Sequence, residues 1–330
     1  MPEPVLTDVH VAAALSDVAV AYYQDQSVYI ADKVFPMVPV QHQSDVYYVW
    51  SKDDFFRDEA QQRADATESA GSGVNLTTQS YSAVVWALHQ DIGDQVRRNA
   101  DPAIDIDVVT TRTLMQKLMI RRDRIFMTKY MTTGVWSVDI TGVASAPTTN
   151  QTYQWSDDAN GDPFTDISNG VTSVLQNTGF EPNVLVLAWP VYQALRKHPL
   201  VVDRIKYTNP AYAGKITPQL LAESFDIEEV LVSRAVYNSA AQGVTGVYGF
   251  AMGKNALLAY RAKSPGLMVA TAGYTFGWTG LLDLNNLGIA VYQFPLPWRG
   301  RNTTRTEAEM AFDMQIVGKD LGYYFTSIVA

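Results

Sequence analysis

Alternating oxygen-bearing side chains in the segment DDANGDPF are the nearest approach to a metal site in this sequence. Asp158, Asn160 and Asp162 have the spacing of the first ligands in a calcium loop. Such a loop also needs a glycine at its sixth position and a glutamate at its twelfth, where this chain has Pro163 and Asn169. The pattern therefore favours a turn over a calcium site.

The histidines and the known catalytic motifs indicate no further chemistry. His10, His42, His89 and His198 are far apart and lack the paired spacing of zinc ligands. The sequence has no GxSxG elbow, no Walker phosphate loop and no GxGxxG fingerprint. Catalytic groups can come together from distant residues, so an α/β enzyme stays an alternative. We nevertheless expect no enzymatic activity, no cofactor and no metal.

Composition limits the class of protein. Of the 330 residues, 47% are hydrophobic and 18% charged, which is enough apolar material for a folded core. The net charge of -9 argues against a protein that coats nucleic acid, because binding to phosphates needs clustered Lys and Arg. The absence of cysteine excludes disulfides and thiolate sites. We expect neither a secretory signal nor a membrane span, since no apolar run reaches about 20 residues.

The first 90 residues predict an arm followed by a long hairpin. Val11, Leu15, Val18 and Tyr22 have the spacing of one helical face. The segment VYIADKVFPMVPV, with two prolines three apart, favours an extended arm or, equally, a first strand of the core. Two aromatic strands, DVYYVWSK and YSAVVWALH, then enclose the polar segment DDFFRDEAQQRADATESAGSG. That segment cannot form a core alone, so it is either flexible or ordered by a neighbouring chain.

A long helix is expected from Asp101 and Pro102 to about Met131. Its apolar stripe comprises Ile104, Val108, Met115, Met119 and Phe126. Acidic residues in its opening turns and basic residues later complement the helix dipole; the basic ones are Arg121, Arg122, Arg124 and Lys129. These basic side chains either pair with another subunit or, as we slightly favour, are solvated.

The remainder of the chain alternates helices and strands, which indicates an α+β or α/β unit. Helices are expected at 164–178, 190–197 and 217–225, and strands at 183–189 and 228–237. From about Gly246 onward the sequence is mostly strand-like.

Several segments spread over nearly the entire chain carry a family resemblance: ADKVFPMVPV, FFRDEAQQRA, TGFEPNVLVL through HPLVVDRIKY, GKNALLAY, KSPGLMVATAGYTFGWTG and EAEMAFDMQIVGKDLGYYFTSIVA. They resemble the tailed-bacteriophage major capsid proteins with the Hong Kong 97 fold, of siphophage or actinophage type. The resemblance implies an α+β fold with an N-terminal arm, an extended β-hairpin loop, a peripheral domain with a long spine helix, and an axial domain.

By position, the resemblance divides the chain into five parts. Residues 1–44 would be the arm, 45–90 the extended loop and 91–133 the peripheral domain's spine helix with its lead-in. Residues 134–285 would hold the axial domain with connecting segments, and 286–330 the returning peripheral strands.

The resemblance also implies candidate contacts between subunits. In the extended loop, two phenylalanines would be apolar anchors with charged pairs around them: Phe55, Phe56, Arg57, Asp58, Glu59 and Arg63. The alternative is a solvated loop whose aromatic side chains fold back on their own hairpin. A second cluster, Arg299, Arg301 and Arg305, would meet acidic residues of a neighbouring extended loop or a local three-fold contact; a solvated turn is the alternative. Lys52 and Asn302 are a conceivable cross-linking pair, but no motif singles them out.

The function implied is that of a structural shell subunit. Copies would assemble into pentamers and hexamers of an icosahedral or prolate head that encloses double-stranded DNA without sequence-specific binding. Further partners would be a separate scaffolding protein, a portal and a decoration protein, with no membrane involved. The location would be the virion capsid, after synthesis and assembly in the host bacterial cytoplasm. A bacterial nanocompartment shell of the encapsulin type is the near alternative.

Overall fold

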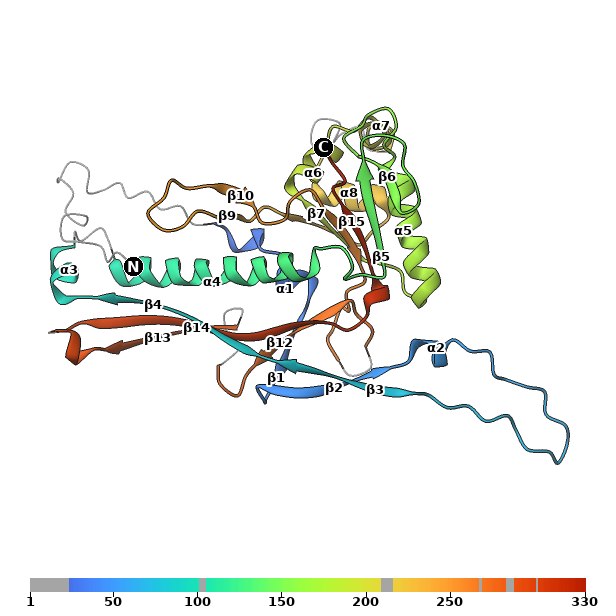
Figure 1. Ribbon diagram of the computed structural model, residues 1–330, viewed down its shortest axis with the longest axis horizontal. Helices are drawn as coiled ribbons and strands as arrows, with labels where there is room; N and C mark the ends of the chain where they lie inside the picture. The colour runs from blue at the N-terminus through green and yellow to red at the C-terminus, as the bar shows by residue number, and fades with distance from the viewer. Residues whose placement is uncertain (1–23, 101–104, 209–215, 267–268, 283–287, 301) are drawn as a thin grey trace.

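The computed structural model describes residues 24–100, 105–208, 216–266, 269–282, 288–300 and 302–330. Figure 1 shows an elongated molecule in which a long helix lies along one sheet, a second sheet with its own helices stands at one end, and a hairpin projects beyond both. The expected helix at residues 11–22 lies outside the described residues.

The first sheet has five strands in the order β1-β12-β14-β13, with β4 also paired to β14. Its strands are β1 (Met37–Val40), β4 (Val84–Ile92), β12 (Gly273–Trp278), β13 (Ile289–Pro295) and β14 (Thr304–Ile316). The helix α4 (Ile106–Tyr130) packs on β14 and β4, along the long axis of the molecule (Figure 1). The short helix α3 (Asp94–Asn99) lies between β4 and α4 in the chain.

The second sheet has six strands in the order β6-β5-β15-β11-β7-β8. These are β5 (Val138–Val143), β6 (Gln151–Tyr153), β7 (Val184–Ala188), β8 (Glu229–Ser233), β11 (Ala256–Ala259) and β15 (Gly322–Thr326). The neighbouring interior strands β11 and β7 are buried at every residue, which is why ALLA and VLVLA are continuous apolar runs. Around the sheet lie α5 (Pro163–Thr178), α6 (Trp189–Leu195), α7 (Pro199–Thr208) and α8 (Pro218–Phe225).

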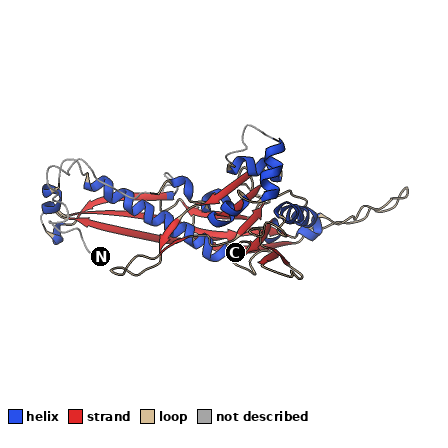
Figure 2. Ribbon diagram, turned by 90° about the horizontal axis from the view of Figure 1, so that it is seen from above, coloured by secondary structure: helices blue, strands red, loops and turns tan. Residues whose placement is uncertain are grey.

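Two smaller hairpins and several short elements complete the fold. One hairpin pairs β2 (Ser44–Trp50) with β3 (Leu76–Ser82), and the other pairs β9 (Val236–Asn238) with β10 (Tyr248–Phe250). The short helical elements are η2 (Gln26–Val28), α1 (Ala31–Val34), α2 (Lys52–Phe55), η4 (Pro297–Arg299) and η5 (Lys319–Leu321). Viewed from above, the β2–β3 hairpin is the thin extension at the end opposite α3 (Figure 2).

An aromatic cluster joins the end of α4 to both sheets. Phe35 is fully buried, and its ring lies 5.1 Å from that of Phe126, 5.0 Å from that of Tyr130 and 6.4 Å from that of Trp136. Tyr130 donates its hydroxyl hydrogen to the carbonyl of Met314 on β14. The cluster therefore ties the helix to the five-stranded sheet and, through Trp136, to the start of β5.

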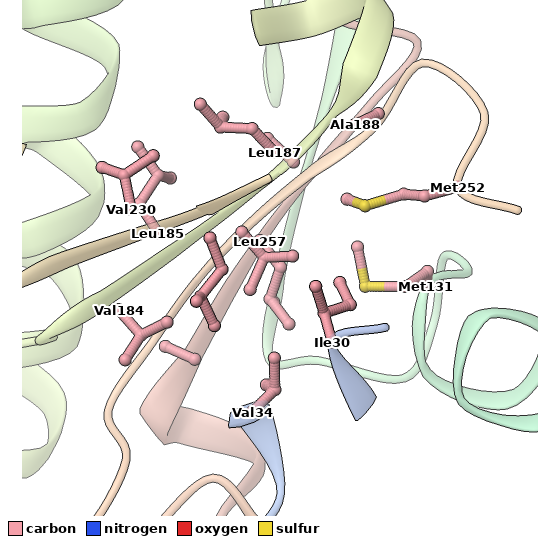
Figure 3. Packing of buried hydrophobic residues seen from close by; sticks show 14 of the residues in the cluster. Ile30, Val34, Met131, Val184, Leu185, Leu187, Ala188, Val230, Met252 and Leu257 are labelled. Atoms are coloured by element: carbon pink, nitrogen blue, oxygen red, sulfur yellow. The ribbon is translucent and has the colours of Figure 1, made fainter. Parts of the chain in front are cut away.

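The N-terminal segment around α1 is held to α4 by buried charges. Asp123 Oδ1 accepts the backbone N–H groups of Ile30 and Ala31, both at 3.0 Å. The buried guanidinium of Arg122, on α4, pairs with Asp32, which lies in the single turn of α1. Ile30 lies in the same apolar core as Met131 and the β11 residue Leu257 (Figure 3). The carboxylate of Asp123 thus supplies the acceptor for two N–H groups at the start of α1.

The structure confirms most of the expected helices and strands. Thr217 caps α8 and Asp162 caps α5, and Gly179 ends α5 in the left-handed conformation. The segment at residues 37–40 is a core strand, as one of the two interpretations had it, and residues 31–34 form an unpredicted helical turn.

Other expectations were wrong in detail. The long helix begins at Ile106 rather than near Asp101, because Asp105 Oδ1 accepts the N–H of Val108 and caps it there. Of the predicted stripe, Met119 and Phe126 are buried and Met115 packs against the core, whereas Val108 is 43% exposed and Ile104 lies outside the described residues. The strand expected at 81–89 is two strands, β3 and β4, which belong to different sheets. The strand expected at 228–237 is likewise divided into β8 and β9.

Close packing at Gly322 yields a first test. A Cβ atom at this position would overlap the ring of Trp136, which is 4% exposed and cannot move into solvent. We expect Gly322→Ala to lower the free energy of unfolding by about 1–3 kcal/mol, the usual cost of overpacking. Gly71→Ala is the matched control, because Gly71 has open space around it. Urea unfolding of the unassembled chain measures both, and equal midpoints for the two variants would contradict the packing argument.

The buried carboxylate of Asp123 makes stability depend on pH. Burial raises its pKa from 3.8 to about 6, against the lowering effect of the two backbone N–H groups. Since the folded chain holds this proton more tightly than the unfolded chain, the group's contribution is full below about pH 4 and is lost as pH rises towards 6. We expect Asp123→Asn to remove this dependence, because the amide keeps an acceptor and does not titrate.

Thermal unfolding of the unassembled chain between pH 4 and 7 checks this expectation. The wild-type stability should fall relative to the variant as pH rises through this range. Asp58→Asn, in the exposed loop, is the control and should follow the wild-type curve. A difference between wild type and Asp123→Asn that is constant with pH would show that this carboxyl does not titrate there.

Candidate intersubunit surfaces

The β2–β3 hairpin extends beyond the body of the molecule and carries the first predicted contact residues (Figures 1 and 2). Its strands pair from Ser44↔Ser82 to Trp50↔Leu76. Residues 56–75 beyond α2 contain neither helix nor strand, and most are exposed. Asp54 closes the base of this loop, because its Oδ2 accepts both the backbone N–H and the side-chain amide of Asn75 at 2.8 Å.

The two predicted aromatic anchors are exposed. Phe55 is 54% exposed and packs edge-on against Trp50, 6.4 Å between ring centroids, while Phe56 is 62% exposed and lies against Gly179 at the end of α5. Arg57 pairs with Asp54 at 3.3 Å and with Glu59 at 3.7 Å. The other two residues of the predicted set, Asp58 and Arg63, are exposed in the loop. Their contact with another subunit stays a prediction.

Both faces of β2 carry apolar side chains, a feature that was not predicted from the sequence. On one face, Tyr47 packs against Phe276, and Tyr81 of β3 stacks on the same ring at 4.6 Å. On the other face, alternate residues Val46 and Tyr48 are 55% and 62% exposed. The sequence does contain a signal for this, because apolar residues occupy consecutive positions of the strand. A strand covered on one side only would have polar residues at every second position.

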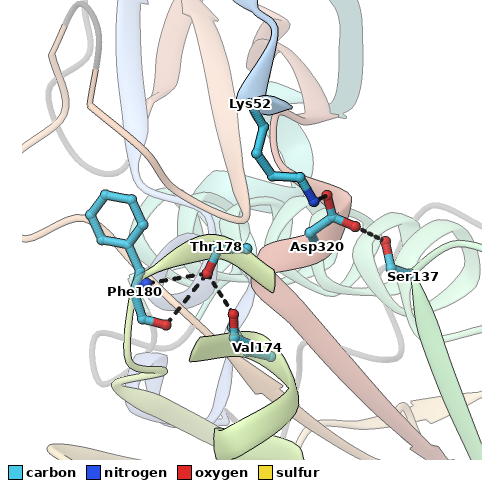
Figure 4. A network of polar contacts seen from close by, with 6 residues as sticks. All are labelled: Lys52, Ser137, Val174, Thr178, Phe180 and Asp320. Atoms are coloured by element: carbon cyan, nitrogen blue, oxygen red, sulfur yellow. Dashed lines mark hydrogen bonds and ion pairs between the residues drawn. The ribbon is translucent and has the colours of Figure 1, made fainter. Parts of the chain in front are cut away.

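A polar network fixes the base of the hairpin to the body. Lys52 Nζ donates to Asp320 Oδ2 at 2.5 Å, and Ser137 Oγ donates to the other oxygen of this carboxylate (Figure 4). Burial alone would raise the pKa of Asp320, but the hydrogen bonds from Lys52 and Ser137 hold it below its ordinary value. Lys52 is therefore engaged within its own chain. In the same view, Thr178 Oγ1 bonds the carbonyl of Val174 and the N–H of Phe180 at the end of α5.

At the opposite end of the molecule, the second predicted cluster is organised by Asp91 of β4. Arg299 donates to Asp91 Oδ2 at 2.6 Å, and Arg305 makes two hydrogen bonds to the carboxylate at 2.7 and 2.9 Å. These bonds, those of Arg305 foremost, hold the pKa of Asp91 below its ordinary value. Arg301 lies outside the described residues. The intrachain partner Asp91 was missed because it lies more than 200 residues away in sequence.

Among the basic side chains of α4, Arg121, Arg124 and Lys129 are exposed, as the favoured interpretation had it, and that interpretation was wrong for Arg122. Arg122 is buried and pairs with Asp32, Arg121 lies 4.3 Å above the ring of Trp86, and Arg124 lies 4.4 Å above that of Tyr237. Cation–π contacts of this kind keep the charge at the surface while the stem packs on the ring.

The described residues were also compared with the requirements of a metal site and of a membrane-spanning helix. Within the described ranges, no group of three or more His, Asp or Glu side chains could hold a metal ion. The segment DDANGDPF forms a turn in which Asp157 binds Asn160 and Asp162 caps α5. Of the helices that the structure describes, none is both long and apolar enough to span a bilayer.

Comparison with known proteins shows which proteins this chain is similar to. No protein-family model matches the chain. The major capsid protein of Pseudomonas phage JBD67 is 24% identical over 321 residues, which cover 96% of each chain. The major capsid protein of Burkholderia phage BcepMu is 31% identical over 102 residues. That match covers 31% of each of the two chains.

Solved structures extend the likeness in fold. A phage-related protein from Bordetella bronchiseptica RB50 superposes with a TM-score of 0.68 at 21% identity, over 92% of this chain and 93% of that one. The capsid structure of cyanophage P-SCSP1u gives a TM-score of 0.61 at 11% identity, over 97% and 93%. The fold is therefore the Hong Kong 97-type capsid fold. In sequence, the chain is similar to these two phage major capsid proteins.

The arginine cluster yields a test of its own. We expect Asp91→Asn to lower the free energy of unfolding by about 1–3 kcal/mol, because an amide cannot accept from both guanidinium groups as a carboxylate does. The effect should shrink as pH falls below about 4, since a carboxyl with a lowered pKa contributes stability above its ordinary pKa and loses it on protonation.

Asp94→Asn is the matched control for this variant. Asp94 pairs with Arg98, which is 71% exposed, so its loss should cost only about 0–1 kcal/mol. Urea unfolding, with hydrogen exchange of peptides from β13 and β14, measures the two variants. Equal losses would mean that the Asp91 cluster behaves as an ordinary surface ion pair.

Proposed function

We propose that this chain is the main structural subunit of a phage head, in which its copies form pentamers and hexamers of an icosahedral or prolate shell around double-stranded DNA. The observation that carries the proposal is the likeness in fold to the capsid structure of cyanophage P-SCSP1u over 97% of the chain. The relationship to two phage major capsid proteins supports it. On this basis the protein acts by assembly and catalyses no reaction.

The exposed hairpin supports assembly by overlapping contacts. A ribbon with exposed aromatic residues on one face and a 20-residue loop has no core of its own and gains buried area only against another surface. Residues 45–90 would therefore lie over an adjacent subunit, with Phe55 and Phe56 as anchors. Residues 91–133 and 286–330 would form the peripheral domain, and 134–285 the axial domain.

Further partners follow from the same proposal. Closing a head requires a portal, and the chain would use a separate scaffolding protein; a decoration protein could bind the outer surface. The acidic net charge of -9 suits a wall that encloses DNA without binding its sequence. Assembly would take place in the bacterial cytoplasm, and the final location would be the virion. Particles from an infected culture would contain DNA, whereas an encapsulin-type compartment would contain a protein cargo.

Electron microscopy and sedimentation of the purified chain, alone and with a candidate scaffold, test the proposal. Closed shells, or rings of five and six, are the expected result. A strictly monomeric species in both conditions would contradict it.

The anchor residues can be tested in the same assay. We expect the double variant Phe55→Ala, Phe56→Ala to raise the protein concentration needed for assembly about tenfold or more, because truncating a buried aromatic anchor typically costs more than 1 kcal/mol. The double variant Gln61→Ala, Gln62→Ala changes two exposed polar residues of the same loop and should assemble like wild type. If both double variants assemble like wild type, the phenylalanines are not anchors.

A further inference from the structure

The turn between β13 and β14 presents an exposed indole. Trp298, in η4, is 76% exposed, the highest fraction of any large apolar side chain in the described part of the chain. Tryptophan is among the residues most enriched at the centres of protein interfaces, because it combines a large apolar area with one N–H donor. Its exposure in the single chain therefore makes it a candidate contact residue.

Hydrogen bonds and ion pairs anchor the described residues at both ends of this turn. Leu296 is fully buried, its N–H donates to the carbonyl of Thr303 at 2.7 Å, and the N–H of Arg299 donates to the carbonyl of Leu296 at 3.1 Å. The side chains of Arg299 and Arg305 bind Asp91 from either end of the turn. Trp298 thus projects from a fixed position, which lowers the entropy that a contact would have to overcome.

A groove lies at the same end of the molecule, between the start of α4 and strands β13 and β14. Its volume is about 360 Å³, and its apolar lining comes from Val108, Val291 and Tyr292. Val108 and Tyr292 are 43% and 45% exposed, so the lining is open to solvent. Thr306 also lines the groove, is 2% exposed, and its hydroxyl Oγ1 has no hydrogen-bond partner among the described residues. A volume of this size lies within the range of about 300–1,000 Å³ that holds small organic groups.

The occupant is not the tryptophan of the same chain, because Trp298 is exposed. Figure 1 shows α3, the start of α4 and the β13–β14 turn together at one end of the long axis. A projection and a groove at different places on one surface generate a head-to-tail contact, in which each copy gives its projection to the next and receives one from the previous copy.

Charge supports the same pairing. Residues 296–305 contain three arginines and no acidic residue, and with the carboxylate of Asp91, which binds Arg299 and Arg305, three positive charges and one negative charge give the turn a net charge of +2. The groove opens beside Asp105 and Asp107 at the start of α4, with Arg112 one turn further along. A basic turn and an acidic helix start attract one another, although Asp107 already accepts from Arg97 at 2.8 Å.

We propose that Trp298 of one copy inserts into the groove formed by Val108, Val291 and Tyr292 of a second copy. This inference rests on the proposed function and gives it a particular contact. The β13–β14 turns of neighbouring copies then meet at this end of the molecule, and the contact closes a ring of copies.

Photo-crosslinking tests the contact directly. Trp298 is replaced with p-benzoyl-phenylalanine, which keeps an aromatic side chain of similar reach, and this protein is assembled together with nitrogen-15-labelled wild type. We expect crosslinked peptides that join a light residue 298 to heavy peptides containing Val108 or residues 291–293. Crosslinks that fall elsewhere, or that join only light peptides, would overturn the proposal.

Substitutions provide a second measurement. Trp298→Ala should raise the concentration needed for assembly about tenfold or more, and Trp298→Phe should recover part of the loss. Val108→Trp fills the groove from its own helix and should have the same effect, with no further loss when it is combined with Trp298→Ala. Tyr248→Ala, which removes an aromatic that is 75% exposed on the other hairpin, is the control and should leave the crosslinks at position 298 unchanged.

The outcomes separate this inference from the proposed function. If wild type forms shells and Trp298→Ala forms them at the same concentration, the contact is wrong and the capsid function stands. If wild type forms neither shells nor rings with or without scaffold, the proposed function fails and takes this contact with it.

Discussion

The burial of Phe35 against the end of α4 is the contact on which the arrangement of this helix and the first sheet depends. Its ring fills the space left by Gly273 of β12, where a Cβ atom would lie 2.5 Å from Phe35 Cζ, and it packs on Phe126 and Tyr130 of the helix. The carbonyl of Phe35 accepts the hydroxyl of Thr275 at 3.1 Å. One side chain from the N-terminal segment thus connects the helix with a strand about 240 residues further along, so the helix and the first sheet form a single unit.

Buried charge performs a comparable task beside this aromatic cluster. Asp123 and Arg122 are both almost fully buried, and each holds a group of the segment around α1. A buried ion pair with apolar surroundings adds little net stability but leaves an uncompensated charge if the segment detaches. The main effect of these buried charges is therefore to make detachment of the α1 segment costly in free energy, and this cost fixes the path of the chain. Their net contribution to stability is small.

Local sequence signals were sufficient for the elements whose caps and periodicity agree, and insufficient where distant contacts decide. Helices α5 and α8 were predictable because Asp162 and Thr217 cap them and an apolar face follows. The apolar part of the buried face of α4, with Met119 and Phe126, was also predictable, but its charged members Arg122 and Asp123 were not, since their partners lie about 90 residues away. Likewise, the arginines at 299 and 305 were recognisable as a cluster, but their partner Asp91 and the groove beside α4 arise only from the pairing of β4, β13 and β14.

The β2–β3 ribbon has a thermodynamic consequence for the unassembled protein. Residues 56–75 bury almost nothing in the single chain, so the free energy that orders them cannot come from the subunit's own core. In the proposed assembly, ordering is deferred to the moment when another subunit covers the ribbon, so that assembly becomes in part a folding reaction. Such a reaction has a large negative heat-capacity change, and its driving force consequently weakens on cooling.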